Sequence, residues 1–370
     1  MPNNTDYQKR ISSELLGKSD RDFRKYFEFY DQLVADTEMF ALQVEHPQPH
    51  DLAPVSHDEI MVAAKLLREN PAQTLDNAIQ KLQKELKARH STHQIRLAVI
   101  VAVRAMLMLD PAVSDRYGPG YAIGHYRHVS WQTDERLDDF VSRCFPKAPK
   151  ESERVAEALA DKRSLKAWKL ESRLGIMFKK TDNLAQHLLL DPENNILYLF
   201  HHATFLQMQL ARLQTQNAKK EEDVTTCLES GCLPPRLLAE TLHSLQSILF
   251  HWNDRPSSSI LGRLIRRRGF DEACDEPEGL QMFDDSQERF QYLYWGERLA
   301  TLHDFVVDRP PRNKFERWVK WQTSDSNAFF IALLALAVSI LVGLLSLGLS
   351  GLQAWIAWKA WKEPNSPPDA

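Results

Sequence analysis

An uncharged segment near the C-terminus constrains the fold of this chain more than any other feature. It runs for 33 residues from Ser326 to Trp358, and most of its side chains are aliphatic. A helix needs about 20 apolar residues to cross a bilayer core of about 30 Å, so the segment is long enough to span it. Buried helices of soluble proteins seldom run beyond about 14 residues without a charge. The segment therefore predicts one transmembrane helix.

Tryptophans and basic residues on both sides of this segment predict where it meets the two surfaces of a bilayer. Indole rings prefer the headgroup zone, and five tryptophans bracket the segment: Trp318, Trp321, Trp355, Trp358 and Trp361. Five basic residues precede it: Arg309, Arg312, Lys314, Arg317 and Lys320. Only Lys359 and Lys362 follow it, so the positive-inside rule predicts that the preceding residues are cytosolic. The five basic groups either contact anionic headgroups, at about 1 kcal/mol each, or only fix the topology.

The first residues of the chain do not resemble a signal peptide, which would reverse this orientation. The first ten residues, MPNNTDYQKR, lack the apolar core of a signal peptide. We therefore expect a tail-anchored, single-pass membrane protein whose N-terminal bulk is cytosolic, with the lipid bilayer as one partner. Among the organelles we favour the endoplasmic reticulum.

Small residues recur along one side of the predicted span. Ser339, Gly343, Ser346 and Ser350 are spaced by four, three and four positions, which places them on one helical face. Such a stripe lets two transmembrane helices approach closely and gain dispersion contacts. It predicts a homodimer through the transmembrane helix, although small residues are also common in membrane helices that do not pair.

Composition excludes several classes of protein. The hydrophobic fraction is 43% and the charged fraction 26%, which excludes wholesale disorder. The net charge of −4 does not suit a dedicated nucleic-acid binder, so we expect no nucleic-acid partner. The four cysteines are too few and too scattered for a disulfide framework. Cys227 and Cys232 lack the second ligand pair that a structural zinc site needs.

Helical periodicity dominates the residues before the span. One-sided apolar spacing and capping residues predict helices over 20–43, 56–69, 71–86, 134–144, 164–174, 183–190, 202–214, 234–252, 257–268 and 286–307. Ser56 and Glu59 have the spacing of a capping box. The apolar run Thr92–Asp110 is interrupted by Arg96 and Arg104, and a charge in mid-bilayer costs at least about 2.5 kcal/mol. We therefore predict a buried helix there rather than a second span.

The predicted fold class is mainly α, a helical cytosolic region followed by one C-terminal transmembrane helix. Two short apolar runs, Ile176–Phe178 and Ile196–Phe200, predict at most a small two- or three-stranded sheet. A Pro/Lys-rich link near residue 150 divides the cytosolic region. The predicted segments are a helical region at 1–150, a second mostly helical region with the possible β element at 151–308, a basic juxtamembrane segment at 309–325, the transmembrane helix with its interfacial end at 326–358, and a polar tail at 359–370.

A search for catalytic and cofactor motifs finds little. The run GPGYAIG at 118–124 lacks the spacing and the βαβ setting of a dinucleotide-binding loop. His125 and His128 lack a firm third ligand, and His201 and His202 are interpreted as hydrogen-bonded structural histidines. We therefore predict no catalytic residue, no cofactor and no metal ligand.

Three segments carry a resemblance to a protein family: SLKAWKLESRLGIMFKKTDNLAQHLLLDPENNILYLFHHATFL at 164–206, ILGRLIRRRGFDEAC at 260–274, and the C-terminal anchor with its Trp-rich end. Through these segments, which cover about a third of the chain, it resembles a group of uncharacterised filamentous-fungal membrane proteins. The resemblance implies a mostly helical cytosolic region ahead of a C-terminal anchor. It brings no activity and no site residues.

These observations leave three hypotheses for function. The preferred one is a membrane-tethered adaptor or scaffold that binds a cytosolic protein partner through its helical region. The second is a membrane-bound enzyme whose site is assembled from distant residues, with these histidines as candidates: His125, His128, His187, His201 and His202. A deep pocket that gathers several of them with carboxylates would favour the enzyme. The third is a fungal incompatibility or cell-death factor that acts on membranes.

Overall fold

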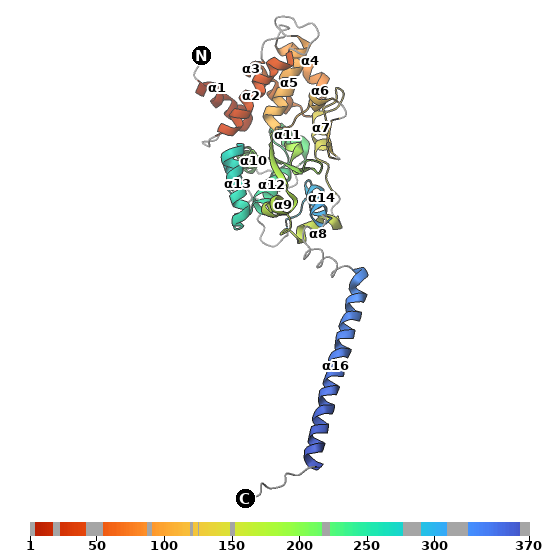
Figure 1. Cartoon of the computed structure of the whole chain (residues 1–370). Coiled ribbons are helices and arrows are strands. Elements are labelled where there is room, and N and C mark those ends of the chain that lie inside the picture. Colours follow the sequence, from red (N-terminus) through yellow and green to blue (C-terminus); the bar gives the residue numbers. More distant parts are fainter. Residues whose placement is uncertain are drawn as a thin grey trace. The chain divides into compact units, whose positions relative to one another are not determined.

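The structure is a computed structural model, and it divides into two units at residue 307. It describes residues 4–17, 23–41, 55–86, 91–118, 121–124, 126–148, 152–216, 223–276, 290–308 and 325–362. Residues 1–307 form the first unit and residues 308–370 the second (Figure 1). The fold class is mainly α, as predicted, and the two small sheets found among the described residues lie in the first unit.

The N-terminal half of the first unit is built around one buried helix. α5 (Thr92–Leu107) is packed by α2 (Arg24–Ala41), α3 (His57–Glu69) and α4 (Leu75–Glu85), while α1 (Asn4–Ile11) precedes them. These neighbours explain why α5 is apolar on nearly all sides, since it has almost no face left for water. The prediction of a buried helix at this position is confirmed. The capping box at the start of α3 is confirmed as well.

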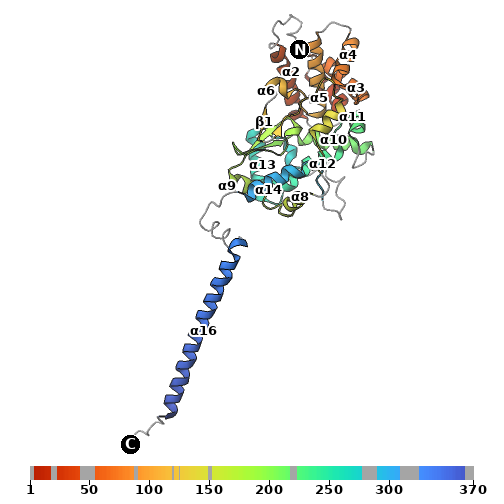
Figure 2. The same cartoon turned by 90° about the vertical axis from the view of Figure 1, so that its right-hand side faces the viewer.

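Helices also dominate the rest of the unit. Figures 1 and 2 both show α3, α4 and α5 gathered at one end and α8, α9 and α14 at the other. The bounds are α6 Val113–Tyr117, α7 Leu137–Cys144, α8 Glu153–Ala160, α9 Ala167–Leu174, α10 Ala203–Thr215, α11 Val224–Glu229, α12 Pro235–His243, α13 Arg255–Arg268 and α14 Gly296–Val307. Two segments are π-helical, η1 Ser12–Leu16 and η3 Ser244–Leu249. Two short 3₁₀ turns are η2 Leu184–Gln186 and η4 Glu272–Asp275. One core cluster contains buried residues from both halves, from Ile11 to Leu302.

A three-stranded sheet forms where the sequence predicts strands. β3 (Met177–Thr181) pairs in parallel with β5 (Ile196–Phe200), and Thr181 lies opposite Phe200 at the end of the register. β4 (Leu189–Asp191) pairs antiparallel on the other side of β5. The central strand is the most buried of the three, with Leu197, Leu199 and Phe200 in the core.

One sequence prediction near this sheet was wrong. Residues 183–190 were expected to be helical, but the only helical turn there is η2, which ends at Gln186. Leu188 then has φ +58°, and β4 begins at Leu189. The segment before α7 contains a hairpin of β1 (Ala122–Ile123) and β2 (Tyr126–Arg127), which the sequence did not predict. Its turn glycine Gly124 has φ +56°, and a Cβ there would lie 2.9 Å from the carbonyl oxygen of Leu190. Close packing therefore explains this glycine of the GPGYAIG run.

The start of α14 also differs from the prediction. A helix was expected from residue 286, but the described residues 290–295 are not helical and α14 begins at Gly296. Glu240 of α12 accepts the backbone N–H groups of Leu293, Tyr294 and Trp295. These bonds to a distant side chain replace the local bonds of a helical turn, so the helix starts later.

The second unit contains one long helix, α16 (Asp325–Lys362, 38 residues). The most apolar stretch within Ala335–Lys359 has a mean hydropathy of 2.2, and none of that stretch is buried. At 1.5 Å per residue the 25-residue segment Ala335–Lys359 is about 37 Å long, which exceeds a bilayer core. Among the described residues, it is the one helix long and apolar enough to cross a membrane.

Candidate functional site

The carboxyl ends of β3 and β5 bring three polar side chains together. Asp182 directly follows β3, and His201 and His202 directly follow β5. Because the strands are parallel and in register up to Thr181 and Phe200, the residues after them lie at the same edge of the sheet. His202 also stands immediately before α10, which fixes the direction in which the chain leaves the strand.

The two imidazoles share one oxygen of Asp182. Nε2 of His202 lies 2.7 Å from Oδ1 of Asp182, and Nε2 of His201 lies 3.1 Å from the same atom. The histidine side chains are 2% exposed, whereas that of Asp182 is 44% exposed. The centroids of the two rings are 4.0 Å apart. The carboxylate therefore lies at the border between the buried rings and solvent.

Burial and hydrogen bonding set the charges of this cluster. Burial, and then the neighbouring His202, lower the pKa of His201 to about 3, so its imidazole is neutral at pH 7. Burial alone would raise the pKa of Asp182, but the hydrogen bonds from the two histidines lower it well below its usual range. Arg104 of α5 interacts electrostatically with this carboxylate and with Asp36. The cluster thus combines an anionic oxygen with at least one neutral ring.

Each ring also has a nitrogen without a hydrogen bond. Nδ1 of His201 and Nδ1 of His202 are buried, and neither has a partner among the described residues. A buried polar atom without a partner costs about 1–3 kcal/mol. The prediction that both are hydrogen-bonded structural histidines is therefore met at Nε2 only.

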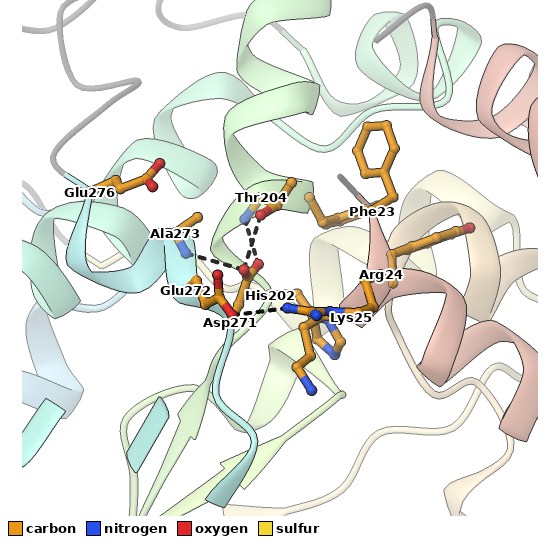
Figure 3. A pocket seen from close by; sticks show the side chains of 11 residues that line it. Phe23, Arg24, Lys25, His202, Thr204, Asp271, Glu272, Ala273 and Glu276 are labelled. Carbon is orange, nitrogen blue, oxygen red and sulfur yellow. Dashed lines mark hydrogen bonds and ion pairs between the residues drawn. The ribbon is translucent and has the colours of Figure 1, made fainter. Parts of the chain in front are cut away.

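A cavity of about 340 Å³ adjoins His202 (Figure 3). Asp271 accepts the backbone N–H of Thr204 at 2.8 Å and its hydroxyl at 3.0 Å, and so caps the start of α10. Arg24 of α2 forms an ion pair of 2.9 Å with Glu272. Figure 3 shows these groups around the opening, with α2 facing the turn that contains Asp271. The walls of the cavity thus contain acidic and basic side chains. Another part of the wall is aromatic, where Phe205 stacks on Tyr26.

The structure does not bring all the candidate histidines together. His187 is fully buried, accepts the N–H of Phe200 at Nδ1, and lies 2.7 Å through Nε2 from the hydroxyl oxygen of Ser244. Because Nδ1 is an acceptor, Nε2 carries the proton and donates to Ser244, whose own proton goes to the carbonyl of Thr241. This pair is therefore structural and does not activate a serine nucleophile.

The remaining candidates lie elsewhere. Nε2 of His128 lies 2.8 Å from Nε2 of Gln186, away from the shared carboxylate, and His125 lies outside the described residues. All four cysteines are buried and free of disulfides. Burial raises the pKa of Cys232 to about 11 and raises those of Cys144 and Cys274 further, which does not suit a thiolate nucleophile.

The predicted membrane residues are described only in part. Trp355, Trp358 and Trp361 are exposed on α16, and the ammonium groups of Lys359 and Lys362 lie 5.6 Å and 4.6 Å from the rings of Trp355 and Trp358. The predicted pairing residues are exposed on the same helix: Ser339, Gly343, Ser346 and Ser350. The other interface residues lie outside the described part of the chain: Arg309, Arg312, Lys314, Trp318, Arg317, Lys320 and Trp321.

Sequence reasoning did not find Asp182. Its position after an apolar run was visible, but the pairing that places it beside His201 and His202 joins segments 19 and 20 residues apart. Among the described residues, these three form the one group of metal-ligating side chains that could hold an ion. Comparisons of the chain with protein-family models, curated proteins and solved structures found no match.

Proposed function

We propose that this chain is a tail-anchored, single-pass membrane protein whose helical N-terminal bulk lies in the cytosol. The single observation that carries the proposal is α16, whose most apolar stretch within Ala335–Lys359 has no buried residue. Exposed leucines over such a length are costly in water, because each side chain contributes about 1.5–3 kcal/mol when it leaves water. A bilayer removes that cost. At the C-terminal end of α16, two lysines lie over tryptophan rings, and such pairs suit the headgroup zone of a bilayer.

Membrane extraction tests this proposal directly. The full chain and a variant that ends at residue 324 are expressed in eukaryotic cells, and their membranes are washed with alkaline carbonate. We expect the full chain in the pellet and the shortened variant in the supernatant. A third variant with an unrelated transmembrane helix in place of residues 326–358 should return to the pellet. Release of the full chain by carbonate would contradict the anchor.

Orientation is tested on the same membranes with a tag at each end. If the bulk is cytosolic, added protease removes the N-terminal tag and leaves a protected C-terminal fragment. Protection of the N-terminal tag would contradict the proposed topology. Fluorescence of the tagged chain against organelle markers then tests the proposed location in the endoplasmic reticulum.

Within this arrangement we propose that the cytosolic unit is an adaptor or scaffold for a protein partner. Trp252, between η3 and α13, supports this because its side chain is 68% exposed, and tryptophan is enriched among residues that dominate protein binding. Proximity labelling in living cells should mark a partner that is lost with Trp252→Ser. Tyr117→Ser, which removes another exposed aromatic ring, is the matched control.

A membrane-bound enzyme is the second candidate, and one observation favours it. Asp182, His201 and His202 form a cluster beside a cavity, which is more than a scaffold requires. The resemblance to filamentous-fungal membrane proteins and the cell-death hypothesis stay predictions. Toxicity on overexpression that disappears in the variant ending at residue 324 would support a cell-death role.

A further inference from the structure

We propose that Asp182, His201 and His202 bind one divalent transition-metal ion, with zinc as the favoured metal. The proposal does not depend on the adaptor function or on the membrane anchor. It reverses the expectation from sequence that the chain has no metal ligand.

The ligand atoms already converge. The three candidate atoms lie within 4.8 Å of one another, and both Nε2 atoms point at Oδ1 of Asp182. In tetrahedral zinc sites with bonds of about 2.0–2.2 Å, neighbouring ligand atoms are about 3.3 Å apart. The present separations from Oδ1 are 2.7 Å and 3.1 Å, so an ion needs the carboxylate to withdraw by only a few tenths of an ångström. Asp182 has room for this because it borders solvent.

The chemical types of the three groups suit a metal ion. Asp182 offers a carboxylate oxygen and the two histidines offer imidazole nitrogens, which are the atoms that zinc binds in proteins. Without a metal, one carboxylate oxygen lies within hydrogen-bond distance of both Nε2 atoms. The cluster therefore already gathers three ligand atoms of suitable types.

The ligand atoms indicate which metals the site would bind, and the surrounding charges indicate which ligand would occupy the open coordination position. Imidazole nitrogen suits zinc, iron, nickel or copper rather than calcium or magnesium, which prefer all-oxygen sites. Two nitrogens and one oxygen leave a fourth position of the catalytic type. Two cationic groups act on the cluster, Arg104 on Asp182 and Lys180 on His201, and the anion Asp36 acts on Arg104. A divalent ion would make the site positive overall, so the open position favours an anionic ligand such as hydroxide.

The second coordination sphere limits the affinity. When Nε2 binds a metal, the proton of a neutral ring moves to Nδ1, which has no partner among the described residues in either histidine. Missing second-sphere hydrogen bonds lower metal affinity by about 10–100-fold. We therefore expect binding weaker than that of a closed structural zinc site, with loss of the ion on treatment with a chelator.

Cobalt titration of the full chain tests the proposal. The protein is purified in detergent with a tag that contains no histidine, stripped with a chelator, and titrated with Co²⁺. We expect one Co²⁺ per chain with the visible absorption of a four-coordinate site, and displacement by Zn²⁺. Asp182→Asn and His202→Gln should weaken Co²⁺ binding by at least about tenfold, since each removes a ligand. His251→Gln, a change outside the cluster, is the matched control and should bind as the parent does.

Three outcomes would overturn the proposal: no uptake of Co²⁺, equal uptake by the parent and Asp182→Asn, or a stoichiometry that falls equally with His251→Gln. Circular dichroism establishes that each variant is folded. If Asp182→Asn and His202→Gln do not fold, X-ray absorption of the zinc-loaded parent decides instead. A zinc ion bound by two imidazoles and by further oxygen or nitrogen ligands would support the site. Sulfur ligands, or fewer than two imidazoles, would refute it.

Discussion

His202 donates its Nε2–H to Oδ1 of Asp182 across 2.7 Å, and this bond joins the ends of two strands that pair in parallel. His201 approaches the same oxygen, so one carboxylate accepts an Nε2–H group from each of two buried rings. The contact therefore links the stability of the sheet edge to the chemistry of the candidate metal site.

The first prediction concerns the stability that Asp182 provides without metal. Asp182→Ala leaves two nearly buried Nε2–H groups without an acceptor, and it should lower the free energy of unfolding by about 2 kcal/mol. Asp182→Asn retains one acceptor oxygen and should cost less. Urea unfolding of the chelator-treated full chain measures both. Arg10→Ala breaks an exposed ion pair and, as control, should change stability by less than about 0.5 kcal/mol. Equal losses for all three variants would contradict the role of Asp182.

The second prediction is a loss of stability in mild acid. Burial is the main cause that lowers the pKa of both His201 and His243 to about 3, while the unfolded value is about 6.5. Between these values the unfolded chain binds the protons and the folded chain does not, so stability falls as pH decreases from about 6.5. Each histidine costs about 1.4 kcal/mol per pH unit, or about 4 kcal/mol for the pair by pH 5.

Unfolding free energies measured in urea between pH 5 and pH 8 test this sign and slope. His243→Gln should reduce the slope below pH 6 by about one proton, or about 1.4 kcal/mol per pH unit, because this ring no longer contributes. His201 and His187, whose pKa values burial also lowers, still contribute in the variant. His243 lies 2.7 Å from the hydroxyl of Tyr292, and glutamine can keep a hydrogen bond there. A slope that does not change in His243→Gln would show that this ring is not held neutral.

The third prediction concerns Glu240, which holds the segment before α14. Glu240 is fully buried and accepts three backbone N–H groups, from Leu293, Tyr294 and Trp295. Glu240→Ala should lower the free energy of unfolding by about 3 kcal/mol, because it leaves one buried and two half-buried backbone donors without their acceptor. Glu240→Gln keeps one of the two oxygens and should lose less. Glu157→Ala, an exposed change on α8, is the control in the same urea measurement. A loss below about 1 kcal/mol for Glu240→Ala would contradict this account.

The fourth prediction concerns pairing of α16 in the membrane. Ser339→Leu combined with Gly343→Leu should abolish crosslinked dimers, because bulky side chains keep two helices apart. Ala337→Leu combined with Gly348→Leu places the same bulk on the opposite helical face and should leave crosslinking unchanged. Crosslinking of the full chain in membranes provides the measurement. Dimers that persist in the first pair of substitutions would show that the helix does not pair through this face.

Sequence patterns were most successful where a local signal defines an element. The central strand Ile196–Phe200 has the predicted bounds, and Gly175 and Gly269 end their helices in the left-handed conformation that glycine favours. The buried helix at Thr92–Leu107 follows from an apolar run that Arg96 and Arg104 interrupt. Each of these signals lies within one short stretch of the chain.

Patterns failed where a distant contact competes with local preference. Residues 189–191 could have continued a helix, but the free edge of β5 offered backbone partners for a strand. The segment before Gly296 lost its helical bonds to the carboxylate of Glu240. The candidate site could not be predicted from the sequence for the same reason. No local pattern indicates that Asp182 lies beside His201 and His202.

The sequence alone therefore determined the mainly helical fold and the apolar C-terminal helix. Both depend on periodicity and length, which are properties of neighbouring residues. Only the tertiary structure decided which polar groups meet, how β3 and β5 pair, and which histidines share a carboxylate. These relationships depend on the packing of segments far apart in the chain, and a single sequence carries no direct record of such distances.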